Sequence, residues 1–148
     1  VVSGDPKVER DSPCRLHGGH QGRCVGFRDG FPRFHTVELV GRGEFITAYA
    51  RLADGNTPAD CERVLTERYQ MEPFVNMAPQ GVLPATQYVR GSNRVMLGVV
   101  PDRVPGRVIL MSTLDNLVKG SAGQAVQNFN LMFDLPETTG LEQVTMFP

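Results

Sequence analysis

The pattern of hydrophobic and polar positions divides the chain into two unequal parts. Residues 1–42 are rich in Gly, Pro, Arg, His and Asp, and they show no sustained period of 2 or 3.6 residues, so we expect irregular structure there. From Gly43 onward the pattern becomes regular. We therefore predict an irregular, atypical segment at residues 1–42 and a single folded domain at residues 43–148.

Strand and helix signals follow one another through the regular part. In chain order, the predicted elements are a strand at 44–52, a helix beginning after Thr57, strands at 74–77, 88–100 (continuous or broken near Gly91) and 107–113, and a helix at 117–133. Thr57 is a suitable N-cap and Pro58 suits the first helical position. This order predicts an α+β fold, with a mixed, largely antiparallel sheet covered by helices on one face.

The last predicted helix departs from the usual amphipathic pattern. Gly120 and Gly123 interrupt it, and each glycine costs about 1 kcal/mol relative to Ala in a helix interior. Something therefore packs close to this backbone, and a nucleotide cofactor or a facing domain would fit. The apolar side chains of this helix point in several directions, which predicts a second partner surface beyond one sheet. They are Leu117, Val118, Ala125, Val126, Phe129, Leu131, Met132 and Phe133.

Composition narrows the classes of function. The 148 residues are 41% hydrophobic and 21% charged, which is typical of one globular domain. Fifteen basic and sixteen acidic residues leave a net charge of -1, which argues against nucleic acid and an anionic membrane as partners. No apolar run approaches the roughly 20 residues that span a bilayer. Three cysteines favour a reducing compartment, so we expect a cytoplasmic protein.

The segment before residue 42 contains a cluster of soft ligands, namely Cys14, His17, His20 and Cys24. Four such groups could enclose Zn²⁺, but the spacing is unusual for a zinc site, and no second Cys-x-x-Cys supports it. We therefore assign no metal site and keep zinc as an alternative. A catalytic pair of Cys14 and His17 lacks a third residue to orient the base.

The abrupt change in composition near Arg42 is explained if the residues before it and after it have different origins. The chain begins with Val1 rather than Met, and we expect it to be a segment of a longer protein. Residues 1 to about 40 are interpreted as a reading-frame shift or a gene-model error joined to an authentic C-terminal part. Family-like sequence in another frame of the coding DNA would support this hypothesis, and its absence would reject it.

Two motifs near the end of the chain carry a family resemblance. Residues 115–128, DNLVKGSAGQAVQN, and residues 135–141, LPETTGL, resemble N-acetyl-γ-glutamyl-phosphate reductase. Supporting pieces are EPFV at 72–75, GVLPAT at 81–86 and VRGSN at 89–93. The resemblance covers residues 42–148, roughly the last third of a family member. It implies an arginine-biosynthesis enzyme in which NADPH reduces N-acetyl-glutamyl phosphate to a semialdehyde through a cysteine thioester.

The resemblance also implies an architecture. A Rossmann domain holds NADP, an α+β domain completes the site and forms homo-oligomers, and the last helix packs back on the Rossmann domain. Asn116 resembles the family asparagine that can hydrogen-bond the nicotinamide carboxamide, and Gly120 and Gly123 would allow close approach to the cofactor or its domain.

Further site candidates follow from the same resemblance. Lys119 is a candidate for the edge of the substrate site, and Ser92 and Asn93 could reach the substrate. Simpler interpretations stay open: Asn116 could be an N-cap, Lys119 a solvated residue, and Ser92 and Asn93 members of a turn at a strand edge.

The chain also departs from the family. The family nucleophile follows Gly and precedes Tyr-Pro-Thr, and none of Cys14, Cys24 and Cys61 has that setting. The family histidine stretch and a Gly-x-Gly-x-x-Gly turn are not found either. We therefore assign no catalytic residue and expect the chain to be inactive alone. The alternative is a non-enzymatic module that dimerises through its sheet or docks on a separate Rossmann chain.

Overall fold

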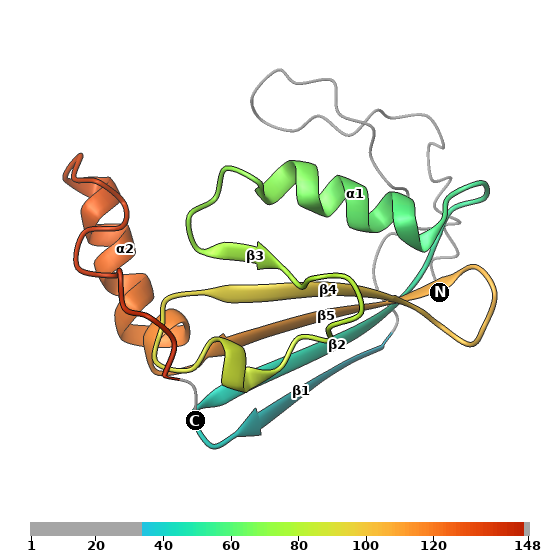
Figure 1. The fold of residues 1–148 in the computed structure, drawn as a ribbon, viewed down its shortest axis with the longest axis horizontal. Coiled ribbons are helices and arrows are strands. Elements are labelled where there is room, and N and C mark those ends of the chain that lie inside the picture. The colour runs from blue at the N-terminus through green and yellow to red at the C-terminus, as the bar shows by residue number, and fades with distance from the viewer. Residues whose placement is uncertain (1–33, 147–148) are drawn as a thin grey trace, which may run out of the picture.

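A computed structural model describes residues 34–146, which form one sheet and two helices (Figure 1). The elements are β1 (Phe34–Val40), β2 (Gly43–Arg51), α1 (Pro58–Tyr69), β3 (Val75–Met77), β4 (Val95–Pro101), β5 (Arg107–Asp115) and α2 (Gly123–Met132). A 3-10 turn lies at Thr86–Tyr88, and a π-helical turn at Val118–Ala122 leads into α2.

The sheet has five strands in the order β1-β2-β5-β4-β3. The pairs β1–β2, β2–β5 and β5–β4 are antiparallel, and only β3 runs parallel to its neighbour, β4. The central pair runs from Gly43 opposite Asp115 to Arg51 opposite Arg107. The predicted α+β class with a mixed, largely antiparallel sheet is confirmed.

The presence of strand β1 contradicts part of the prediction for residues 1–42. Irregular structure was predicted through residue 42, and this is wrong for residues 34–40, which pair with β2 from Phe34 opposite Tyr49 to Val40 opposite Gly43. Gly41 makes the tight turn between the two strands with a φ of +59°. An edge strand takes its hydrogen bonds from one neighbour, so pairing with β2 can stabilise a segment whose own periodicity is weak.

The remaining predictions for the first segment lie outside the described residues. They concern Cys14, His17, His20 and Cys24 and the hypothesis of a shifted reading frame. The division at residue 42 therefore stays a prediction for residues 1–33.

A second correction concerns the strand expected at residues 88–100. Only Val95–Pro101 is extended, as β4, and the residues before it form turns. Gly91 has a φ of +76°, which a strand does not accommodate, and the Ser92 hydroxyl donates to the carbonyl of Val89 at 2.7 Å. The local turn chemistry therefore overrides the apolar pattern in this stretch.

Helix α1 covers one face of the sheet. Thr57 caps it as predicted: the Thr57 hydroxyl accepts from the backbone N–H of Asp60 at 3.2 Å, and the Asp60 carboxylate accepts from the backbone N–H of Thr57 at 3.0 Å. The helix lies over β3 and β4, and its Cys61, which is 3% exposed, joins the core beneath it. The core consists of Ala50, Leu52, Cys61 and Val108, flanked by Leu65, Val99 and Leu110.

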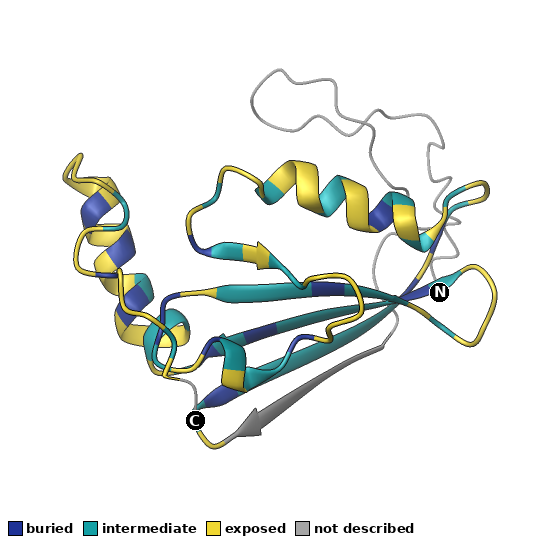
Figure 2. Ribbon diagram, in the orientation of Figure 1, coloured by how far each residue is buried: buried dark blue, intermediate teal, exposed yellow. Residues whose placement is uncertain are grey.

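Helix α2 does not lie on the sheet. It follows the end of β5 through the π-helical turn and projects beyond that end of the sheet (Figure 1). Its large apolar side chains are exposed, including Phe129 at 53% and Met132 at 78% (Figure 2). None of the helices between residues 34 and 146 is long and apolar enough to cross a lipid bilayer.

Candidate functional site

The residues singled out from the sequence gather where β5 ends. Three segments meet there: the turn between β1 and β2 with Arg42, the turn 89–93, and residues 115–123 that lead into α2. The backbone N–H of Asn116 donates to the carbonyl of Arg42 at 2.8 Å, and the backbone N–H of Gly91 donates to the Asp115 carboxylate at 2.7 Å. Hydrogen bonds therefore bring residues distant in sequence to one place.

Asp115 is the centre of this arrangement. Its side chain has no exposed surface, and its carboxylate accepts from the backbone N–H groups of Gly91, Leu117 and Val118 at 2.7, 2.9 and 3.1 Å. The Arg42 guanidinium lies 3.5 Å from the same carboxylate. The buried charge is thus both paired and hydrogen-bonded, as a buried carboxylate must be to avoid a large desolvation cost.

Asn116 presents its side chain beside this carboxylate. Its Oδ1 atom lies over Gly120, where a Cβ atom would come within 2.6 Å of it. The Asn116 amide forms no side-chain hydrogen bond to any residue between 41 and 146, and the residue is half-buried. The sequence predicted that a group packs closely against Gly120, and in the structure that group is the Asn116 side chain. Contact of Asn116 with a nicotinamide stays a prediction.

Gly123 also has its close neighbours within the chain. It is buried, and a Cβ atom there would collide with Oδ1 of Asn93 and approach the carbonyl oxygen of Val118 to 2.8 Å. The Asn93 Nδ2 group donates to Gln127 Oε1 at 2.9 Å, so this side chain ties the turn 89–93 to α2. Packing inside the chain is sufficient to explain glycine at this position.

Ser92 and Asn93 are both fully buried, at 0% exposure. The Ser92 hydroxyl is bonded to the carbonyl of Val89, and Asn93 Oδ1 has no hydrogen-bond partner. Both side chains face the interior here, where they hold the turn rather than line an open site. Their contact with a substrate stays a prediction.

Lys119 points towards α2 instead of into solvent. Its Nζ donates to Gln127 Oε1 at 2.6 Å and lies 5.4 Å from the centre of the Phe74 ring. Burial lowers the pKa of Lys119, and the negative charges of Glu137 and Glu72 partly offset this effect. The solvated alternative therefore does not describe Lys119 in this chain, and its place at a substrate site stays a prediction.

Sequence reasoning missed three polar residues that build this region. Asp115 was quoted only as part of a motif, although an Asp shortly before a helix is a recognised N-cap signal. Gln127 donates to Glu137 at 2.6 Å, and Asn130 donates to the carbonyls of Glu137 and Thr139 at 3.1 and 2.9 Å. These two side chains hold the C-terminal segment against α2, and only the three-dimensional contacts reveal them.

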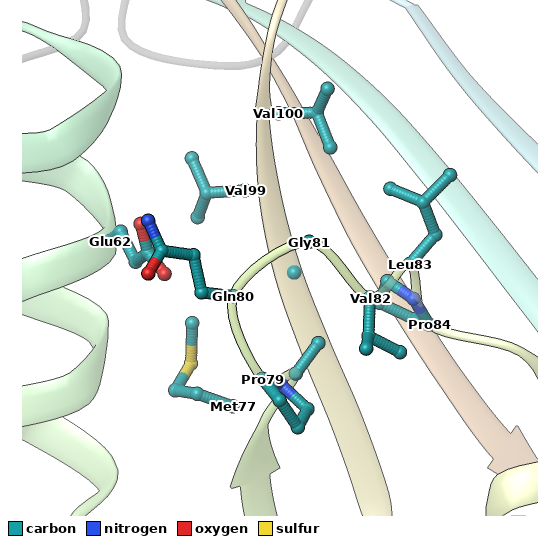
Figure 3. A pocket seen from close by; sticks show the side chains of 12 residues that line it. Glu62, Met77, Pro79, Gln80, Gly81, Val82, Leu83, Pro84, Val99 and Val100 are labelled. Atoms are coloured by element: carbon teal, nitrogen blue, oxygen red, sulfur yellow. The ribbon is translucent and has the colours of Figure 1, made fainter.

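A separate cavity lies where β3 ends beside β4 (Figure 3). It has a volume of about 230 Å³, and its lining residues are Glu62, Met77, Ala78, Pro79, Gln80, Gly81, Val82, Leu83, Pro84, Gly98, Val99 and Val100. Glu62 is the one ionisable group in this lining, so it offers no acid-base pair. Among residues 34–146, no group of three or more His, Cys, Asp or Glu side chains could hold a metal ion.

The fold and the matched residues define the class of protein. Residues 34–116 match the family of the semialdehyde dehydrogenase dimerisation domain, and the chain belongs to this family. Its relatives are more specific, and the resemblance found in the sequence is confirmed: the chain is 47–50% identical to proteins named N-acetyl-gamma-glutamyl-phosphate reductase.

Three of these relatives show the extent of the match. The reductase of Prochlorococcus marinus (strain NATL1A) is 47% identical over 115 residues, which cover 77% of this chain and 32% of that protein. The reductase of Geobacter metallireducens is 50% identical over 114 residues, covering 77% and 33%. A probable chloroplastic reductase of Arabidopsis thaliana is 48% identical over 114 residues, covering 77% and 28%. The chain thus spans about a third of the curated relatives it matches.

Solved structures support the fold. A probable aspartate-semialdehyde dehydrogenase from Pseudomonas aeruginosa superposes with a TM-score of 0.50 at 23% identity. Aspartate semialdehyde dehydrogenase II from Vibrio cholerae gives a TM-score of 0.50 at 19% identity. Each match covers 62% of this chain and 27% of the other. The shared fold therefore accounts for about a quarter of each of those two chains.

Proposed function

We propose that this chain is the C-terminal part of an NADPH-dependent N-acetyl-γ-glutamyl-phosphate reductase of arginine biosynthesis, and that it is inactive alone. The observation that carries the proposal is the 47–50% identity to reductases of that name, through a match that spans only about a third of them. The complete enzyme would convert N-acetyl-glutamyl phosphate to a cysteine thioester with loss of phosphate. NADPH supplies the hydride that releases the semialdehyde. We place the protein in the cytoplasm.

Within that enzyme, the proposed role of this chain at the cofactor is positioning. The Asn116 amide has no side-chain hydrogen bond within residues 41–146, and it is half-buried. A carboxamide offers both a donor and an acceptor, which complement those of a second carboxamide. Asn116 is therefore proposed to hold the nicotinamide carboxamide, with Gly120 leaving room for its side chain. Gly123, Lys119, Ser92 and Asn93 would support the same end of the site.

The exposed side of α2 is the proposed contact with the cofactor-binding Rossmann domain. Phe129, Leu131, Met132 and Phe133 are each more than half exposed, and the two phenylalanine rings lie 4.5 Å apart. Several large exposed apolar side chains gathered on one helix and its C-cap are typical of an interface. We define these four residues as the α2 stripe.

The sheet face opposite α1 is the proposed contact between copies of the chain. Alternation along β2 and β5 places Phe45, Tyr49, Ile109 and Met111 on that face, and all four are partly exposed. The match to a dimerisation domain ends at residue 116, before α2. This supports a homo-oligomer formed through the sheet, with α2 left free for the Rossmann domain.

The test is reconstitution. The purified chain is mixed with the separately produced part of a relative that precedes the matched segment, which would carry both the cofactor-binding domain and the nucleophilic cysteine, and NADPH fluorescence and acyl-phosphate-dependent oxidation of NADPH are measured. We expect neither signal from the chain alone, binding and turnover from the mixture, and weaker NADPH binding with Asn116→Ala. Exposed Asn128→Ala is the matched control and should behave as wild type. A mixture that binds no NADPH would contradict the proposal.

One observation favours a second candidate, a non-enzymatic interaction module. Cys61 is the only cysteine within residues 34–146, and it is buried in the core, where desolvation raises the pKa of its thiol. A nucleophilic thiolate needs the opposite environment. If the chain dimerises but gives neither NADPH binding nor turnover with any supplied domain, the module is the better description. Zinc bound stoichiometrically to the purified chain would favour the third alternative, a metal-binding N-terminal segment.

A further inference from the structure

We propose that Asp115 is a positioning residue: its buried carboxylate fixes the backbone around Asn116 and thereby holds the Asn116 amide ready for its ligand. The inference rests on the proposed function, because the ligand of that amide is the nicotinamide carboxamide assigned above. Asp115 itself touches no substrate or cofactor in this account, and it acts through its neighbour in the chain.

The hydrogen bonds of Asp115 fix the backbone that follows Asn116. One carboxylate oxygen, Oδ1, accepts from Leu117 and Val118, the two residues that follow Asn116. The backbone N–H of Asn116 is itself fixed by the carbonyl of Arg42 at 2.8 Å. The peptide groups on both sides of Asn116 are therefore restrained, and only the rotations of its own side chain remain.

Gly120 restricts those rotations further. The Asn116 Oδ1 atom rests against the glycine, at a place that a Cβ atom would crowd to 2.6 Å. The amide thus lies across the first turn after β5 although nothing within residues 41–146 hydrogen-bonds to it. A polar group held in place without a partner is prepared for one that arrives from outside.

The chemistry requires a carboxylate at position 115. Oδ1 accepts from two N–H groups, and Oδ2 accepts from Gly91 and faces the Arg42 guanidinium at 3.5 Å. Both oxygens meet only donors. Asparagine has the same shape but one acceptor oxygen, and in either orientation its NH₂ group would face a donor. Asp115→Asn therefore removes the restraint while it changes the volume very little.

The first test needs no cofactor. Nuclear spin relaxation of the Asn116 side-chain NH₂ group is measured in the full chain. We expect a rigid group in the wild type, with an order parameter near that of ordered backbone at about 0.85, and a value below about 0.6 in Asp115→Asn. Glu142→Gln, an exposed carboxylate in the same C-terminal segment, is the control and should leave the wild-type value unchanged. A mobile amide in the wild type would overturn the inference.

The second test is a double-mutant cycle for NADPH affinity in the reconstituted complex. We expect Asn116→Ala and Asp115→Asn each to weaken binding by roughly 2- to 12-fold, the range for loss of one hydrogen bond, and the double variant to be no weaker than Asn116→Ala alone. Additive effects would overturn the positioning role and leave the proposed function intact. No effect of Asn116→Ala would reject the assignment of Asn116 and this inference with it.

A further variant keeps the inference testable if Asp115→Asn fails to fold. Gly120→Ala displaces the Asn116 side chain and leaves Asp115 and its hydrogen bonds in place. We expect Gly120→Ala to weaken NADPH binding in the wild-type background and to have no additional effect in Asn116→Ala. Equal loss in both backgrounds would contradict the inference, because the amide position would then be irrelevant.

Discussion

The core under α1 and helix α2 bury different kinds of residue. In the part formed by residues 43–116, apolar side chains such as Leu52 and Val108 lie inside, at 4% and 0% exposure. In residues 117–146, the buried side chains of α2 are Gln127 and Asn130, whereas Leu131 and Met132 are exposed. An amphipathic helix normally does the reverse. The first part is thus folded on its own core, and the second leaves large apolar residues exposed.

The largest expected effect is a difference in unfolding free energy between substitutions of two leucines, one in each region. Leu52→Ala removes a buried side chain from the core under α1 and should lower the free energy of unfolding by about 2–5 kcal/mol. Leu131→Ala, at a site 53% exposed, should change it by less than about 0.5 kcal/mol. Urea denaturation of both variants measures the difference. Equal losses would mean that α2 is packed into a core as α1 is.

The second expected effect is a loss of stability where α2 meets the turn 89–93. Gly123→Ala should destabilise the chain by about 1–3 kcal/mol, because the new methyl group would press on Asn93 and on the Val118 carbonyl. In an ordinary helix the same change stabilises by up to about 1 kcal/mol. Exposed Ser121→Ala in the preceding turn is the control, and thermal unfolding reports both. A stabilised Gly123→Ala would show that α2 does not contact the turn 89–93 closely.

The third effect tests how α1 begins. Thr57→Ala should cost about 1 kcal/mol, since it removes the acceptor for the backbone N–H of Asp60. Thr66→Ala, whose hydroxyl only bonds the carbonyl of Glu62 in the exposed middle of α1, should have a smaller effect. Denaturant titration at neutral pH would distinguish them, and equal stabilities would contradict the capping box.

The same cap predicts a pH dependence. Hydrogen bonds from the Thr57 side chain and backbone lower the pKa of Asp60 below its ordinary value of 3.8. The carboxylate therefore contributes stability above that value, and the contribution is lost as the pH falls through the lowered pKa of the folded state. The difference between wild type and Thr57→Ala should narrow over this acidic range. A gap of constant size would argue that the Asp60 carboxylate does not take part.

Of these variants, changes in the α2 stripe should have the smallest effect on stability, but the largest effect on association with the cofactor domain. Leu131→Gln with Met132→Gln should change the free energy of unfolding by less than about 0.5 kcal/mol, because both side chains are exposed. The pair should nevertheless weaken binding of the supplied cofactor domain, measured by analytical ultracentrifugation. Met71→Gln, which removes an 85% exposed methionine from the other region, is the matched control. Undiminished binding would exclude the α2 stripe as the contact.

The first region was largely predictable because local signals agree with the tertiary structure. Thr57, Pro58 and the stripe after them predict α1, and alternation with turn residues at each end predicts β2 and β5. Strand β1 was missed because its stability comes from β2, a partner outside any local window. The turn 89–93 was predicted as part of a strand because of its apolar residues, although a break near Gly91, where the φ is +76°, was one alternative.

The sequence singled out the candidate site residues but not the contacts among them. The motif around Asn116 and the two glycines lies where β5 ends, and its role as a cofactor site stays a prediction. The close neighbours of those glycines are Asn116 and Asn93, and the latter is 30 residues away from Gly123 along the chain. Asp115 was overlooked because its hydrogen bonds to Gly91 and its pairing with Arg42 depend on strand registers that a single sequence does not display.

The π-helical turn at Val118–Ala122 sets the direction in which the α2 stripe faces. Such a turn holds one more residue than the equivalent α-helical turn, and each residue of an α-helix rotates the following side chains by about 100°. Removing one residue from the turn would leave the composition and length of α2 unchanged but swing the stripe around the helix axis. The surface offered to a partner is therefore governed by the count of residues between Asp115 and Gly123, so insertions and deletions there should be far less tolerated than substitutions.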